Sequence, residues 1–277
     1  MLSDGFATSA AGFSQTDNSF VPGADQFAGF MPQGWGMSAG SFDRGSNLMS
    51  GGLGDDFAGA GLLFDLDHDD FDSGPFKPRD SSNCSFSQST GRVTCPPRTV
   101  DGLRITRSFA FTDTSGKAQS APNRATNTVN TQVIVTGTIV THDKKDTTTV
   151  NHSSDQTVSG LVKTATKRIV NGKSGGTELT DGTNAKATKF TTTRMQGDTT
   201  VGLTIPIENH KTSYPIAGTV TRSMKVTVKV AGQPDATSTR REVITYDGSA
   251  TAKVVITQDG TTKNCTLPLP HGHLTCS

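Results

Sequence analysis

The sequence predicts an all-β fold: an elongated antiparallel β-sandwich or meander of about 10 strands, preceded by a Gly/Phe/Asp-rich N-terminal arm. Three observations predict it. Val, Ile and Thr, which favour strands, make up 3 of the first 80 residues and 68 of the remaining 197. After residue 80, apolar residues alternate with polar ones between turn-forming pairs such as Asn-Gly and Asp-Gly. No segment has a sustained period of 3.6 residues, so helices should be few.

The first element, residues 1–80, is a low-complexity acidic Gly/Ser/Phe-rich arm. It contains 14 Gly, ten of the 14 Phe and the only Trp, but no Ile or Tyr. Its 12 Asp and three basic residues give a net charge of 3 − 12 = −9, whereas residues 81–277 have 23 − 13 = +10. Such an arm buries too little aliphatic surface to fold by itself. We therefore expect a separate Thr-rich all-β domain in residues 81–277.

Aromatic side chains are evenly spaced in the arm. They recur every seven residues at Phe6, Phe13, Phe20 and Phe27, and again at Phe57, Phe64 and Phe71. A coiled coil would need a second apolar position per heptad and a helix-forming background, and the arm has neither. Each Phe can instead bury roughly 150–250 Å² on another surface. Docking on the same or a neighbouring subunit and plain disorder are both left open.

One stretch of the arm has the period of a strand. Leu62, Phe64 and Leu66 share one face, and Asp65 and Asp67 share the other. This segment could add to an exposed sheet edge of its own molecule or of a neighbour, as in donor-strand complementation. A short local strand is the alternative interpretation.

An acidic run overlaps this stretch and suggests calcium, because hard cations bind several carboxylate oxygens. It comprises Asp65, Asp67, Asp69, Asp70 and Asp72. An EF-hand loop counted from Asp65 would need Glu at its twelfth position, where the chain has Phe76. A solvated acidic linker is the preferred interpretation, with weak calcium binding as the alternative.

Turn signals divide the all-β domain into its expected strands. The turns are expected at Ser115-Gly116, 142–146, 171–176, 196–198, 232–235, Asp247-Gly248 and Asp259-Gly260. The strands between them are expected at 102–112, 126–141, 156–170, 185–195, 199–207, 214–230, 237–246, 249–257, 261–268 and 273–276. In the clearest examples, Val133 and Val135 share one face of their strand, and Val226 and Val228 alternate with Lys225, Thr227 and Lys229.

Such a series of strands can stack as a sandwich or close as a barrel, and short connections favour a meander. We expect the sandwich, because Thr, at 41 of 197 residues, suits the exposed face of a strand. Strands of about 15 residues would reach roughly 50 Å, which predicts an elongated body.

The four cysteines form an internal repeat at the two ends of the all-β domain. Asn-Cys-Ser-Phe from residue 83 and Asn-Cys-Thr-Leu from residue 264 are each followed, after four residues, by Gly, one residue and Val/Leu-Thr-Cys. A hairpin turning just before the Gly would bring the two cysteines of each copy within disulfide distance. Of the three connectivities we expect Cys84–Cys95 and Cys265–Cys276, each stabilising by roughly 3 kcal/mol.

Zinc is the rival use of these cysteines. Zinc sites take cysteines two to four residues apart, whereas ten residues separate the two of each pair. Disulfides form in oxidising compartments, so we expect an extracellular or cell-envelope location, with the signal peptide already removed. No run of 18 apolar residues predicts a membrane span.

Motifs of catalysis are missing from the sequence. It has no Gly-x-Ser-x-Gly, His-Glu-x-x-His, phosphate-loop or dinucleotide motif. Its only glutamates, Glu178, Glu208 and Glu242, have no second acid nearby in an apolar frame, which disfavours a glycosidase. Basic residues alternate with Thr among few aromatic ones, which disfavours nucleic acid. We expect no enzymatic activity, cofactor, metal site or nucleic-acid partner.

Several segments resemble those of a group of uncharacterised exported bacterial proteins, which are Thr-rich and have Cys-x10-Cys hairpins. They are the Cys84–Cys95 hairpin with Pro96-Pro97, Asp101-Gly102-Leu103 through Ser108-Phe109-Ala110-Phe111, and Gln119-Ser120-Ala121. The resemblance covers roughly residues 81–277. It implies an envelope or extracellular location and an all-β body, but no activity and no site residues. The lipobox Cys of lipoprotein-type signals is absent near residue 1.

These observations favour a non-enzymatic extracellular structural protein. The −9 arm and the +10 domain attract each other, and we expect the arm to dock on a neighbouring subunit. The chain would then self-assemble as a homo-oligomer or polymer, such as a filament or layer on a bacterial cell surface. The alternative is a cell-surface glycan- or ligand-binding β-sandwich module on a flexible stalk.

Overall fold

The computed structural model describes residues 83–140, 145–184, 187–208, 211–212, 214–269 and 273–277. The site residues expected in the arm lie outside the described residues: Phe6, Phe13, Phe20, Phe27, Leu62, Phe64 and Leu66. The described part of the chain is built from fifteen strands and contains no α-helix. The all-β class expected from the sequence is confirmed.

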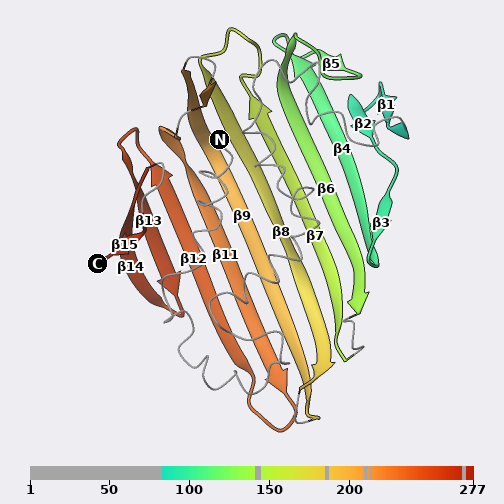
Figure 1. Ribbon diagram of the computed structural model, residues 1–277, viewed down its shortest axis with the longest axis vertical. Helices are drawn as coiled ribbons and strands as arrows, with labels where there is room; N and C mark the ends of the chain where they lie inside the picture. Colours follow the sequence, from blue (N-terminus) through green and yellow to red (C-terminus); the bar gives the residue numbers. More distant parts are fainter. Residues whose placement is uncertain (1–82, 141–144, 185–186, 209–210, 213, 270–272) are drawn as a thin grey trace.

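The strands form a single antiparallel meander (Figure 1). Their bounds are β1 (Ser85–Ser87), β2 (Arg92–Thr94), β3 (Arg98–Val100), β4 (Leu103–Asp113), β5 (Ala118–Gln119), β6 (Thr126–Val140), β7 (Thr147–Ser159), β8 (Lys167–Thr183), β9 (Lys189–Glu208), β10 (Lys211–Thr212), β11 (Ala217–Val230), β12 (Ala236–Tyr246), β13 (Thr251–Gln258), β14 (Thr261–Pro268) and β15 (Thr275–Cys276). They pair in the order β1-β2-β4-β6-β7-β8-β9-β11-β12-β13-β14-β15, with β3 and β5 on β4 and β10 on β9. A sandwich needs two sheets, and the described strands form one.

Two central strands are longer than expected. β8 continues for 17 residues and β9 for 20, so the turns expected at 171–176 and 196–198 are wrong. Glycines lie inside both strands, where Gly175 pairs with Gly197. Each strand has a partner on both sides. The two ladders of backbone hydrogen bonds outweigh the low strand preference of Gly.

A further correction concerns the strand expected at 156–170. β7 ends at Ser159, the chain turns through 160–166, and β8 begins at Lys167. The backbone N–H of Leu161 donates to the Asn127 carbonyl at 3.1 Å, which holds the turn against β6. The Leu161 side chain is buried although it lies in a turn. In the sequence, such a buried apolar turn residue looks the same as a residue of a strand. The first part of β7 has Val150 as its single apolar residue, so it lacks the alternation that would predict a strand.

Short disulfide-linked hairpins close both edges of the sheet. Cys84–Cys95 joins the β1/β2 hairpin and Cys265–Cys276 joins β14/β15, with Cα–Cα distances of 4.1 Å and 4.0 Å. Cys265 and Cys276 are direct partners in the strand register. The outermost strands, β1 and β15, have only three and two residues. Such short edge strands offer little backbone to a further strand.

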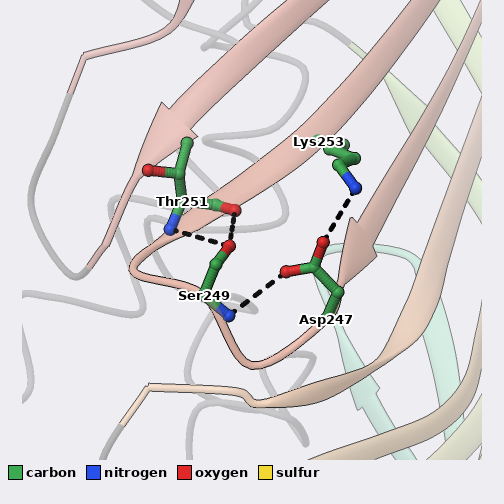
Figure 2. A network of polar contacts seen from close by, with 4 residues as sticks. All are labelled: Asp247, Ser249, Thr251 and Lys253. Carbon is green, nitrogen blue, oxygen red and sulfur yellow. Dashed lines mark hydrogen bonds and ion pairs between the residues drawn. The ribbon is translucent and has the colours of Figure 1, made fainter.

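The turn between β12 and β13 is built from local polar contacts (Figure 2). The Asp247 carboxylate accepts hydrogen bonds from Lys253 Nζ at 2.8 Å and from the Ser249 backbone N–H at 3.2 Å. The Ser249 hydroxyl donates to the Thr251 carbonyl at 2.7 Å. The bonds from Lys253 and Ser249 lower the pKa of Asp247, and the bond to Asp247 raises the pKa of Lys253. The turn signal at Asp247-Gly248 thus marks a real strand boundary.

Buried apolar side chains of the strands lie on one face of the sheet, which we call the inner face. On β6, Val135 is 0% exposed, whereas Ile134 points to the opposite, outer face and is 49% exposed. The inner face carries three apolar clusters. The first includes Phe111, Val129, Val158, Val170, Leu203, Ile205, Ile244 and Val254, the second Leu103, Ile105, Val133, Val135 and Val150, and the third Phe190, Val228 and Val230.

Candidate functional site on the inner face

A row of polar and charged side chains crosses the inner face between these clusters. Strand register places Ser154, Ser174, Asp198, Arg222 and Glu242 opposite one another on β7, β8, β9, β11 and β12. Residues in register share a face, because successive side chains of a strand point to opposite faces. We call these five residues the central row.

Asp198 is the acid in the middle of the central row. The Ser174 hydroxyl donates to Asp198 Oδ2 at 3.3 Å, and Arg222 opposes Asp198 on β11. Burial raises the pKa of Asp198, Arg222 and Ser174 counteract this rise, and the Glu242 carboxylate adds to it. Asp198 therefore holds a proton more tightly than a carboxyl group in water does.

Glu242 ends the central row and contacts an arginine of its own strand. Arg240 donates from Nε to Glu242 Oε1 at 3.0 Å and also donates to this oxygen from Nη2. The Arg240 and Glu242 side chains are 11% and 7% exposed. Hydrogen bonds between two charged groups are shorter and stronger than those between neutral ones, so this contact holds both side chains in place.

A second ion pair lies on the neighbouring strands. Glu178 of β8 opposes Arg194 of β9, with 3.6 Å between Arg194 Nη1 and Glu178 Oε2. Burial raises the pKa of Glu178, and Arg194 counteracts the rise. Three acids and three arginines thus lie on the adjacent strands β8, β9, β11 and β12. We call them the ionic belt: Glu178, Arg194, Asp198, Arg222, Arg240 and Glu242.

His152 of β7 is buried beside the ionic belt. It opposes Gly176 of β8, and burial lowers its pKa, so the fold favours the neutral imidazole. A Cβ atom added at Gly176 would lie 2.3 Å from the Asn151 carbonyl oxygen and 2.9 Å from His152 Cδ2. Position 176 therefore needs a residue without a side chain, because the neighbouring backbone cannot move aside easily.

Arginine predominates among the cations of the inner face, although Lys263 of β14 also lies there and Arg92, Arg104 and Arg241 lie on the outer face. The inner face has Arg107, Arg168, Arg194, Arg222 and Arg240, in register with other inner residues. The lysines of β8, β9, β11 and β13 lie on the outer face, at positions 167, 173, 189, 225, 229 and 253. A guanidinium group is weakly hydrated and forms a planar fork of donors, whereas an ammonium group is strongly hydrated. The cations of the inner face are therefore mainly guanidinium groups, which lose less hydration on burial than ammonium groups do.

The outer face has its own polar network beside β2. Arg92 Nη1 donates to Asn130 Oδ1 at 2.7 Å, and Asp155 accepts from Asn130 Nδ2 at 2.6 Å and Gln132 Nε2 at 2.9 Å. Burial opposes ionisation of Asp155, but these hydrogen bonds and the charges of Arg92 and Lys173 outweigh it and lower its pKa. The contacts join β2, β6 and β7, which indicates a structural role.

The ionic belt is not expected from the sequence. No second acid lies beside Glu242 in an apolar frame of the sequence, but register brings Glu242 close enough to Asp198 to raise the pKa of Asp198. The ionic belt is missed because the two misplaced turns interrupt β8 and β9. In a single unbroken strand, Arg194 and Asp198 are four positions apart and therefore lie on the same face, because side chains alternate between faces.

The predicted disulfide cysteines lie in the edge hairpins, outside the ionic belt. Among the described residues, no group of three or more His, Cys, Asp or Glu is arranged to hold a metal ion. No helix of the described ranges is long and apolar enough to cross a membrane. Comparisons with protein-family models, curated proteins and solved structures find no match.

Proposed function

We propose that the protein is a non-enzymatic extracellular structural protein, a subunit of a fibre or surface assembly in which the N-terminal arm docks on a neighbouring subunit. The apolar inner face of a one-layer sheet carries the proposal. Three apolar clusters lie on this face, and all described strands belong to one sheet, so no second layer of described strands packs against them. Such a face is unfavourable in water. An arm with ten Phe is suited to cover it.

The sheet edges are a poorer route to assembly. Strand addition by the Leu62–Leu66 segment would need a free edge of several residues. The outermost strands have three and two residues, and a disulfide fastens each to its neighbour. β15 pairs with only Cys265 and Thr266 of β14, so a short stretch of β14 at residues 261–263 is left as edge. Docking on the larger face is therefore favoured over addition to an edge.

The two disulfides also support an extracellular or cell-envelope location. All four cysteines are paired. Disulfides persist in oxidising compartments and are rare where thiols are kept reduced. Mass spectrometry of protein isolated under native conditions tests this: four free thiols would argue against export.

The assembly is tested with the full chain and a full-length variant in which Phe57, Phe64 and Phe71 are all replaced by Ser. Light scattering and negative-stain microscopy should show concentration-dependent polymers for the native chain and far fewer for the variant, because the variant loses aromatic burial. Both proteins remaining monodisperse monomers at every concentration would contradict the proposal.

The second candidate is a glycan- or ligand-binding module, and the ionic belt is the observation that favours it. Carboxylate and guanidinium groups such as those of Glu242 and Arg240 are suited to bind sugar hydroxyls. This function is tested by glycan-array binding of the native chain and two variants. Binding that is lost in Glu242→Gln but kept in the outer-face variant Lys225→Gln would favour this function over assembly.

A further inference from the structure

Exposure differs sharply between neighbouring residues of the same strand. On β13, Val254 of the inner face is 3% exposed, whereas Val255 of the outer face is 38% exposed, and β6 shows the same contrast. All described strands lie in one sheet, so no second layer of described residues covers the inner face. The longest part of the chain outside the described residues is 1–82, directly before β1.

The inner face and the arm are complementary in chemistry. The inner face has five arginines against the three acids Glu178, Asp198 and Glu242, which leaves it a positive balance, and the arm has twelve Asp, no Glu and three basic residues. Guanidinium groups bind carboxylates through paired hydrogen bonds. The apolar clusters lie on either side of the ionic belt. In the arm, phenylalanines are likewise separated by stretches that contain aspartates.

The arm is also long enough to cover the face. Twelve strands along the main pairing path span about 58 Å at about 4.8 Å per strand. The 20 residues of β9 span about 66 Å at about 3.3 Å per residue. An extended chain of 82 residues reaches up to about 270 Å. Residues 1–82 can therefore cross the inner face several times, even from a neighbouring subunit.

We propose that the inner face is the surface that receives residues 1–82. Phenylalanines of the arm pack on the three apolar clusters, and its aspartates bind the arginines between them. The segment around Phe64 lies across the inner face beside the ionic belt, with Leu62, Phe64 and Leu66 directed toward the sheet. This inference rests on the proposed function, in which the arm comes from a neighbouring subunit.

Two methionines make the proposal testable in the full chain. Met224 lies on the inner face in register with Arg240, whereas Met195 lies on the outer face and is 50% exposed. In the experiment, Phe64 is replaced by the photo-reactive residue p-benzoylphenylalanine, which attacks the weak C–H bonds beside a thioether sulfur. After irradiation, gel electrophoresis separates crosslinked dimers from monomers, and mass spectrometry locates the crosslink.

We expect a dimer crosslinked at Met224. A crosslink at Met224 within one chain would keep the inner face as the receiving surface but would overturn assembly by arm exchange. A dimer crosslinked at Met195 or at an edge strand would keep the assembly and overturn the inference. Absence of crosslinks to the sheet would also overturn the inference.

Adjacent arginines of β12 provide a matched pair of variants. Arg240 lies on the inner face and Arg241 on the outer face. Arg240→Lys removes the forked donor and should lower the crosslink yield at Met224 by about tenfold, whereas Arg241→Lys should leave it unchanged. Circular dichroism confirms that both variants keep their strands. Equal yields in the two folded variants would contradict binding of the arm by the inner arginines.

Discussion

At the scale of single residues, Gly176 and Gly197 differ in the space beside them. A Cβ atom at Gly176 would lie 2.3 Å from the Asn151 carbonyl oxygen, whereas at Gly197 the nearest atom would be Ser223 Oγ at 3.4 Å. Gly176→Ala should lower the free energy of unfolding by about 1–3 kcal/mol, because backbone must move. Gly197→Ala should change it by less than about 1 kcal/mol. Urea denaturation measures both, and equal losses would contradict the close packing at β7 and β8.

The buried acids give stability an unusual dependence on pH. Burial raises the pKa of Glu178, so the folded protein binds this proton more tightly than the unfolded chain does. The resulting stabilisation is complete below about pH 4 and is lost as the pH rises through the folded pKa. In Glu178→Gln this loss should be absent. Between pH 4 and the folded pKa, the melting temperature of the variant should therefore fall less than that of the native chain, as measured by thermal scans at several pH values.

Asp155 provides the opposite control for that experiment. Its pKa is lowered, so its stabilisation is present above about pH 4 and is lost as the pH falls through the folded pKa. Asp155→Asn should therefore weaken the loss of stability in acid and leave the slope near neutral pH unchanged. Identical pH profiles for the native chain and both variants would contradict the environments assigned to these acids.

Single residues also show what the sequence can and cannot predict. The cysteine repeat predicts its hairpins because the two halves of each pair are close in the chain. The ionic belt joins Glu178, Arg194, Arg222 and Glu242, which lie on four strands and come together only through register. Register depends on strand ends, and an error in one turn shifts every partner beyond it.

At the scale of elements, strands with clear alternation are predicted well, whereas the two long central strands, which have glycines among polar residues, are not. β4, β6, β12 and β14 match the expected ranges within two residues at each end. β8 and β9 fail because Asn-Gly, Gly-Gly and Gly-Asp indicate turns when judged locally. Pairing on both sides decides these segments, and that information lies in the neighbouring strands rather than in the segment itself.

The edge hairpins are the elements that end the sheet. Replacing Cys265 and Cys276 by Ala should lower the free energy of unfolding by about 3 kcal/mol, because the unfolded chain loses the constraint of a 12-residue loop. The Cys84/Cys95 double variant should have a similar cost, since its loop has the same length. Urea denaturation measures both. Unchanged stability in either variant would contradict a clamping role for that hairpin.

At the scale of the whole molecule, an arm of charge −9 and a domain of charge +10 are joined in one chain. The sheet ends in disulfide-linked hairpins, most of its lysines lie on the outer face, and apolar clusters and arginines lie together on the inner face. Aromatic burial and pairing of aspartate with arginine are combined on the inner face, which favours association there. Attraction between exposed charges is screened over about 8 Å at physiological ionic strength, so association should weaken with added salt.

The most direct test is the mass of the full chain measured by light scattering across concentration, at low and at high salt. The arm-docking account predicts a mass that rises with concentration above the 29.0 kDa of one chain at low salt and falls toward it at high salt. A mass of 29.0 kDa at every concentration and in both salts would contradict it.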